Sequence, residues 1–217
     1  PAWLDGLIAK GALGQKTRAG IFRKVGKDIM VLDVDKQDYR LSDRGAAPEV
    51  VEILKTRNPA EKFAKLRASS HPQAQFLWAL FRDLFHYSAY QITNINDTTR
   101  DVDLAIRWGY GWKLGPFETW QAAGWQQVAQ WIAEDIAAGK SMVNAPLPAW
   151  VLDGRAGVHT SEGSYSPTDN AVKPRSDLAV YRRQRYPDPV LGEQFDPGQT
   201  VWENDGVRLW TDGDGIG

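Results

Sequence analysis

The chain has 217 residues, with 26 Lys and Arg against 27 Asp and Glu, so its formal net charge is −1. This balance excludes a general electrostatic grip on nucleic acid or an anionic membrane, since such binding needs a surplus of positive charge. Cysteine is absent, which excludes disulfides, thiolate nucleophiles and cysteine-ligated metals and agrees with a cytoplasmic location. No apolar run approaches the roughly 18 residues of a membrane span.

The first 45 residues predict a short helix followed by a small β meander. Apolar residues within 3–10 have helical spacing, and Gly11 ends that helix because glycine readily takes left-handed backbone angles. Three short β-prone runs follow between residues 21 and 41.

Residues 46–95 predict three helices that begin near Pro48, Pro59 and Pro72, because proline is tolerated in a first helical turn. The third helix is the longest, and a broad apolar stripe predicts its buried face. That stripe consists of Phe76, Leu77, Leu80, Phe81, Leu84, Tyr87 and Ile92.

A second group of helices is predicted between residues 98 and 138. Thr98 and Asp101 have the spacing of a capping box that begins the first of them. A glycine-rich bend over 109–115 separates it from a helix that begins at Pro116, where Glu118 complements the N-terminal dipole. A further helix is predicted from about 126 to 138.

The C-terminal part predicts little regular structure before a final hairpin. Residues 160–200 are rich in Ser, Pro, Asp and Arg and predict a long extended connection. Asp205-Gly206 between two alternating runs predicts a β-hairpin. The connection carries a basic run, interpreted as solvated, with contact to a neighbouring acidic domain as an alternative: Arg175, Arg182, Arg183 and Arg185.

An internal repeat links the two ends of the helical region. Pro1-Ala2-Trp3 recurs as Pro148-Ala149-Trp150, and five positions downstream of each copy then match without gaps. The matched pairs are Gly11 with Gly154, Gly14 with Gly157, Thr17 with Thr160, Gly20 with Gly163 and Phe22 with Tyr165. Glycines at fixed offsets preserve a turn shape, so the two segments are predicted to close two similar helical units.

Two motifs resemble one enzyme family. GALGQKTRAGIF over 11–22 resembles the G-x-L-G-x-K-T-x-x-G-F-Y segment that closes the C-terminal helical domain of 3-hydroxyacyl-CoA dehydrogenases. DLAIRWGYGWKLGPFE over 103–118 resembles the D-x-A-x-x-x-G-x-G-x-x-x-G-P-F-E segment in the middle of that domain. The motif positions, expected to be structural, are Gly11, Gly14, Lys16, Thr17, Gly20, Gly109, Gly111, Gly115, Pro116, Phe117 and Glu118.

The resemblance implies a mainly α fold, similar to the C-terminal domain of 6-phosphogluconate dehydrogenase, with a β meander near the N-terminus and a C-terminal β-hairpin. In the family, the motif matched by 103–118 comes before the one matched by 11–22, whereas here 11–22 comes first. The resemblance therefore implies two copies of the helical domain in tandem. The expected domains are the tail of a first helical domain with the meander (1–45), a second, diverged helical repeat (46–167), an extended linker (168–199) and the start of a crotonase-like domain (200–217).

The function implied by the resemblance is that of a non-catalytic C-terminal part of a multifunctional fatty-acid β-oxidation protein. The parent enzyme would oxidise 3-hydroxyacyl-CoA with NAD, and this chain would supply scaffold, a wall of the acyl-CoA cleft and packing surfaces. Implied partners are an NAD-binding domain upstream, a crotonase-like domain downstream and the acyl-CoA substrate of the parent, and a homodimer is also allowed.

Catalytic and cofactor sites are not expected within the chain itself. No Gly-x-Gly-x-x-Gly follows a predicted strand, so no NAD binding is expected, and no Gly-x-Ser-x-Gly elbow is present. His71, His86 and His159 lack metal-ligand spacing, and the repeat places His159 in a turn opposite Lys16. An acid or base role for Glu118 is a weaker interpretation than helix capping. Contacts of Lys16, Lys113 or the basic run with a CoA phosphate are weaker interpretations than solvated side chains.

Tryptophan supplies the alternative function. The chain has 10 Trp, and six of them surround the glycine-rich bend: Trp78, Trp108, Trp112, Trp120, Trp125 and Trp131. A stand-alone module that binds a glycan or a protein through an aromatic surface is the second hypothesis. Packing between helices accounts for the same residues if they are buried.

Overall fold

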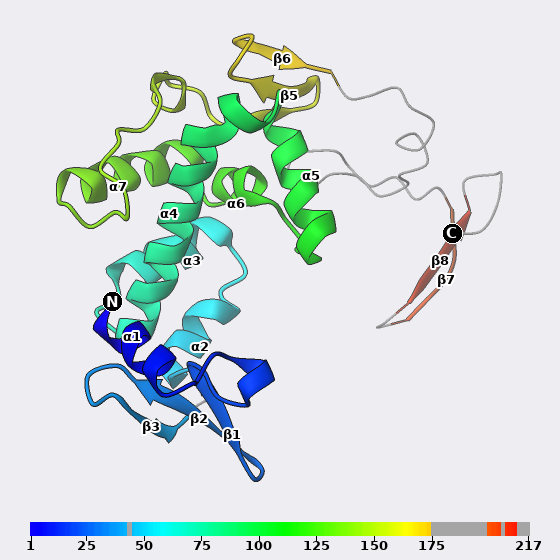
Figure 1. The fold of residues 1–217 in the computed structure, drawn as a ribbon. Coiled ribbons are helices and arrows are strands. Elements are labelled where there is room, and N and C mark those ends of the chain that lie inside the picture. The colour runs from blue at the N-terminus through cyan, green and yellow to red at the C-terminus, as the bar shows by residue number, and fades with distance from the viewer. Residues whose placement is uncertain (43–44, 175–198, 205–206, 212–217) are drawn as a thin grey trace. The chain divides into compact units, whose positions relative to one another are not determined.

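The structure is a computed structural model that describes residues 1–42, 45–174, 199–204 and 207–211. This part of the chain contains seven α-helices and three small antiparallel sheets, so the fold is mainly helical, as predicted (Figure 1). The chain divides into two compact units, Pro1–Ala47 and Pro48–Gly217, which we call unit 1 and unit 2. Among the described residues, no helix combines the length and apolarity needed to cross a bilayer.

Unit 1 contains the predicted helix and the predicted meander. The helix α1 (Ala2–Ala9) is followed by a 3₁₀ turn (Gln15–Thr17) and the strands β1 (Phe22–Val25), β2 (Asp28–Asp33) and β3 (Asp38–Leu41), paired in that order. Gly26 has a positive φ of 59° in the tight turn between β1 and β2, which favours glycine there. The buried apolar side chains in the described part of this unit are Leu7 and Leu32.

The first three helices of unit 2 begin where the prolines predict. They are α2 (Pro48–Lys55), α3 (Pro59–Ala68) and α4 (Pro72–Ile95). The Asn58 side chain caps α3 by accepting the Glu61 N–H at 3.2 Å, and His71 Nδ1 accepts the Gln73 N–H at 3.2 Å at the start of α4.

The predicted buried face of α4 is wrong for three of its residues, while Ile92 is buried as predicted. Phe76, Leu80 and Tyr87 are 65%, 52% and 62% exposed. Besides Ile92, the buried face carries Ala74, Trp78, Arg82, Phe85, His86, Ser88 and Ala89. The indole N–H of Trp78 and the guanidinium of Arg82 are tolerated on this face because Asp135 of α7 accepts their hydrogen bonds, at 2.8 Å from Trp78 Nε1 and 3.3 Å from Arg82 Nη1.

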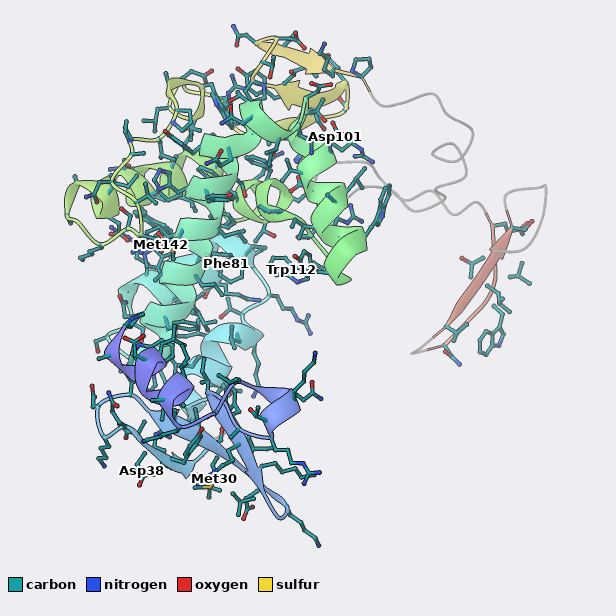
Figure 2. The ribbon with its side chains drawn as sticks, viewed as in Figure 1. Met30, Asp38, Phe81, Asp101, Trp112 and Met142 are labelled. Carbon is teal, nitrogen blue, oxygen red and sulfur yellow. The ribbon has the colours of Figure 1, made fainter. Side chains whose placement is uncertain are left out.

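The remaining helices are α5 (Thr99–Tyr110), α6 (Pro116–Ala122) and α7 (Trp125–Ala137). Figure 1 shows α6 beside α4, with α5 and α7 adjoining it. The predicted capping box is confirmed, since Thr98 Oγ1 accepts the Asp101 N–H and Asp101 Oδ2 accepts the Thr98 N–H, both at 3.3 Å. Figure 2 labels Asp101 at the start of α5 and Trp112 just beyond its end.

The prediction of a long extended connection from residue 160 is wrong over its first part. After a 3₁₀ turn (Ala149–Val151), the strands β4 (His159–Thr160), β5 (Gly163–Ser166) and β6 (Ala171–Lys173) form an antiparallel sheet. All four residues of β5 are buried, although serine and glycine supply three of them. Strands this short and polar give no apolar alternation, which is why the sequence pattern missed them.

The final hairpin is confirmed by the pairing of β7 (Gln199–Glu203) with β8 (Arg208–Thr211). Its predicted turn, Asp205-Gly206, lies outside the described residues, as does the basic run at Arg175, Arg182, Arg183 and Arg185.

The two repeat segments share features of backbone conformation. Gly11 and Gly154 both have positive φ, 69° and 92°, just after a helical turn. Each segment then leads into an antiparallel hairpin, β1–β2 in one and β5–β6 in the other. The first begins with an eight-residue helix and the second with a three-residue 3₁₀ turn. This agrees with their lengths, since Gly11 follows Trp3 by eight positions and Gly154 follows Trp150 by four. Common descent of the two segments stays a prediction.

Candidate functional site

Unit 2 has a buried polar cluster at the point where α5, α6 and β4–β5 meet. Its central residue, Asp103, lies on α5 and is fully buried. The carboxylate accepts the N–H of Phe117 at 2.8 Å through Oδ1 and the N–H of Glu118 at 3.2 Å through Oδ2. These donors belong to the first turn of α6, where helix N–H groups lack partners within the helix. Asp103 therefore caps α6 from a neighbouring helix.

Glu118 completes the cap from within α6. Its Oε2 accepts the Gly115 N–H at 2.7 Å, and its Oε1 pairs with Arg107 Nη1 at 2.9 Å. Arg107 lies one turn after Asp103 on α5, so both residues of α5 hold the start of α6. These contacts give Glu118 the capping role that the sequence favours for it.

His159 connects this helical corner to the sheet. Its Nε2 lies 2.7 Å from Asp103 Oδ2 and its Nδ1 lies 2.8 Å from Ser164 Oγ. His159 and Ser164 are 5% and 3% exposed. The prediction that His159 occupies a turn is wrong, because it lies in β4 and faces α5.

Burial dominates the electrostatics of the cluster. Desolvation raises the pKa of Asp103 to about 6, the bond to His159 opposes that rise, and the nearby Glu118 charge adds to it. The chain of contacts Asp103–His159–Ser164 has the order of a hydrolase triad, yet Ser164 is only 3% exposed, so its Oγ is closed off from any substrate in solution. The cluster therefore has a structural role. Its polar groups compensate one another and hold α5, α6 and the strands β4 and β5 together.

Glycine at position 115 makes the cluster geometrically possible. A Cβ at Gly115 would overlap the Cα, the Cβ and a carboxylate oxygen of Asp103. Gly111 has a different role, since its positive φ of 68° ends α5. Gly109 lies inside α5, and a Cβ there would meet nothing.

The glycine-rich bend does not fit a dinucleotide. In a phosphate-binding turn the helix N–H groups point at the ligand. Here the N–H groups of Gly115, Phe117 and Glu118 are occupied by the carboxylates of Asp103 and Glu118. A pyrophosphate would meet two acidic side chains in place of free donors, and α5 precedes the bend where a Rossmann turn requires a strand.

The second set of motif residues lies in unit 1. Gly14 has a φ of 114°, and its N–H donates to Ala19 O at 2.6 Å. Thr17 Oγ1 accepts the Leu13 N–H at 2.9 Å and lies 3.1 Å from Gly14 O, which fixes the loop. Gly20 is buried against Gly14, and Gly11 follows α1. Lys16 is exposed on this loop, as Lys113 is on the bend of unit 2.

The remaining candidates divide by exposure. Trp78, Trp120 and Trp125 are at most 3% exposed and pack in the core, where Trp120 and Trp125 stack at 4.2 Å between ring centroids. An aromatic binding surface made by all six tryptophans is therefore not supported. Among the described residues, no group of three His, Asp or Glu side chains could hold a metal ion.

The sequence pattern did not identify Asp103 as the central residue of the cluster. Asp103 stands in the quoted motif, but its bond to His159 spans 56 residues and gives no local signal. Gln121 was also missed: its Oε1 accepts the N–H groups of Val158 and His159 at 2.8 and 2.9 Å. The repeat was the available signal, because it marked 154–165 as a unit.

Comparisons with known proteins agree with the motif resemblance. No family model matches the chain, and no solved structure matches it. It is 28% identical over 153 residues to a protein of Bacillus subtilis named probable 3-hydroxyacyl-CoA dehydrogenase, covering 70% of this chain and 18% of that protein. It is 24% identical over 155 residues to a putative fatty acid oxidation complex trifunctional enzyme of Rickettsia felis, covering 68% and 19%.

A similarly named protein of Rickettsia prowazekii is 22% identical over 153 residues, covering 68% of this chain and 19% of that protein. The chain thus spans about a fifth of the length of these curated relatives. Over about 70% of its own length, it is homologous to proteins named 3-hydroxyacyl-CoA dehydrogenase and fatty acid oxidation trifunctional enzyme.

Proposed function

We propose that this chain is a non-catalytic part of a 3-hydroxyacyl-CoA dehydrogenase of fatty-acid oxidation, where it supplies scaffold and packing surfaces in the cytoplasm. The observation that carries the proposal is the cluster around Asp103. Its possible bases, Asp103, Glu118 and His159, are buried and engaged with cluster partners, so none is available to take a proton from a substrate. The fold that goes with this proposal is a helical domain like the C-terminal domain of 6-phosphogluconate dehydrogenase.

The chemistry itself is assigned to other parts of the parent protein. Oxidation of a 3-hydroxyacyl-CoA moves a hydride from C3 to NAD and a proton to a base. The glycine-rich bend does not fit NAD, so we propose that an upstream domain binds the cofactor. This chain is proposed to form a wall of the acyl-CoA cleft. A crotonase-like domain is proposed to begin near residue 200.

A direct assay tests the proposal. The 217-residue chain is mixed with acetoacetyl-CoA and NADH, and NADH absorbance is followed beside the protein expressed from its complete reading frame. We expect turnover by the longer protein and none by the chain. Robust turnover by the chain alone would refute the proposal.

A variant of the longer protein distinguishes a structural role of Asp103 from a catalytic one. Asp103→Asn is expected to lower the melting temperature while kcat, measured well below that temperature, changes less than threefold. A loss of kcat of a hundredfold or more with an unchanged melting temperature would assign Asp103 to the reaction instead. Glu162→Gln, at an exposed position beside the same sheet, is the matched control.

A further inference from the structure

His86 is a buried histidine that is not part of the cluster around Asp103. It belongs to α4 and is 4% exposed. Its Nε2 atom is buried and has no hydrogen-bond partner among the described residues. A neutral imidazole can keep one nitrogen unprotonated at such a position, whereas an imidazolium carries an N–H on both nitrogens and needs an acceptor for each. The surroundings of His86 therefore favour the neutral ring.

His86 also bonds to the segment that follows α7, residues 140–147, which we call the strap. The strap contains neither helix nor strand, and the Met142 N–H, labelled by its residue in Figure 2, donates to Asp83 Oδ1 of α4 at 3.2 Å. The backbone of Ala145 makes a hydrogen bond with the His86 ring that raises the pKa of His86, so the ring is the donor and the Ala145 carbonyl the acceptor. Asp83 and His86 stand three positions apart, so two neighbouring side chains on one face of α4 hold the strap.

The charged side chains that act on His86 are Arg82 and Asp83, both of α4. Burial lowers the pKa of His86, the Arg82 charge lowers it further, and the Asp83 charge opposes both effects. The Asp83 carboxylate already pairs with Arg82 Nη2 at 3.0 Å, and Arg82 Nη1 lies 3.3 Å from Asp135 of α7. The strap itself carries one charged residue, Lys140, which is exposed. A proton on His86 would therefore enter a buried site whose nearest carboxylate is bound to an arginine.

We propose that His86 is a proton-sensitive latch: the neutral ring holds the strap on α4, and protonation of the ring releases the strap while the helices stay folded. Protonation places an N–H on Nε2, where the described residues offer no acceptor, and adds a positive charge in the core. Opening of the strap lets water reach the ring and removes both penalties. The inference concerns the packing of unit 2 and is independent of the proposed function.

The strap is expected to loosen on acidification. Because the pKa of His86 is lowered from 6.5 while the strap is closed, the open state takes up the proton more readily as the pH falls through this value. One such proton raises the equilibrium constant for opening by at most about tenfold between about pH 7.5 and 5.5. Asp103 acts in the opposite direction, since its raised pKa favours the folded state on acidification. Loosening of the strap at low pH is therefore distinguishable from the titration of Asp103.

Amide hydrogen exchange of the 217-residue chain, resolved by NMR and corrected for the chemical exchange rate at each pH, tests the latch. The Met142 amide is the reporter, and its opening constant is expected to rise about three- to tenfold from pH 7.5 to 5.5. His86→Gln keeps an N–H donor for the Ala145 carbonyl but does not titrate, so it should abolish the rise. His71→Asn, which replaces the histidine that caps the same helix, is the matched control and should preserve it. Amides near Phe85 should show no rise.

An NMR titration of the histidine rings in the unmodified chain covers the case in which His86→Gln fails to fold. The neutral His86 ring should carry its proton on Nδ1, and its pKa should lie below 6.5. A pKa at or above that value would overturn the inference. So would a Met142 opening constant that does not change with pH, an equal rise in His86→Gln, or a rise shared with the amides near Phe85, which would show unfolding of α4 in place of strap release. None of these outcomes depends on NADH turnover.

Discussion

Asp103 shows how one buried carboxylate can hold a corner of a fold. It accepts two hydrogen bonds from backbone N–H groups of α6 and shares a third with His159 Nε2, all of them away from water. Such a group stabilises the fold only while its partners stay in place, because removing one leaves a buried charge or donor unpaired.

Replacing Asp103 with Asn is therefore expected to cost about 2–4 kcal/mol of unfolding free energy. The amide presents one acceptor oxygen where the carboxylate presents two, so its NH₂ faces an N–H donor of α6 or the His159 ring. Urea denaturation of the 217-residue chain measures the change. A cost below about 0.5 kcal/mol, the size typical of surface sites, would contradict the assigned role.

The difference in unfolding free energy between wild type and Asp103→Asn is expected to depend on pH. Because burial raises the pKa of Asp103 from 3.8 to about 6, the folded state keeps a proton that the unfolded chain has released in this window. Folding stability is therefore expected to fall as the pH rises from about 4 to about 6, because Asp103 ionises in the unfolded chain before it ionises in the folded one. The advantage of wild type over Asp103→Asn should thus shrink between these values, by at most about 1.4 kcal/mol per pH unit. An advantage that grows with pH would contradict the raised pKa.

Part of the cluster was predictable and part was not. Glu118 stands three residues after Gly115, in the first turn of α6. An acidic residue is favourable there because of the helix dipole, so its capping role was predictable from the sequence alone. The junction of Asp103 with His159 and Ser164 depends on a tertiary fold that brings α5 against β4 and β5. Composition and spacing contain no information on that approach.

At the scale of elements, α4 shows why periodicity can select the wrong face. The bulky apolar residues Phe76, Leu80 and Tyr87 form the stronger hydrophobic pattern, yet they are exposed. The buried face mixes large side chains such as Trp78 and Phe85 with small ones and with Arg82, whose burial is compensated by Asp135. Helix starts were predicted well because caps and N-terminal prolines act locally. Which face is buried depends on the partners of the helix.

The junction of α5 and α6 gives a prediction about glycine. Gly115→Ala should destabilise the chain by about 1–3 kcal/mol, because its Cβ must push the backbone of Asp103 away from α6. Gly109→Ala is the control, since that position is helical with open space around it and alanine should be neutral or stabilising by up to about 1 kcal/mol. Thermal and urea denaturation measure both. Equal effects would argue against the close approach.

At the scale of the whole molecule, the two units differ in how much apolar surface they bury. In the described part of unit 1 the buried apolar side chains are Leu7 and Leu32, while unit 2 buries a contiguous set that includes Phe85, Trp120 and Ile132. Domains of about 40 residues rarely stabilise themselves through a core alone. The mainly helical class and the hairpins were predictable at this scale, and the sheet of β4, β5 and β6 was not.

Unit 1 is accordingly expected to open before unit 2. In native-state hydrogen exchange under increasing urea, amides of β2 near Leu32 should show an opening free energy at least about 2 kcal/mol below that of α4 near Phe85. A single shared value for both would show that the units unfold together. Amides of α7 near Ile132 serve as the internal reference for unit 2.

The stacked pair of Trp120 and Trp125 gives the folded protein an optical label of its own. Their rings lie 4.2 Å apart between centroids at an interplanar angle of 20°, inside the core of unit 2. Two indoles this close and held at a fixed angle are expected to couple their electronic transitions. The circular dichroism of the native chain should then carry an exciton contribution that the denatured chain lacks. The integrity of the α6–α7 corner can therefore be followed spectroscopically, without a dye or an engineered reporter.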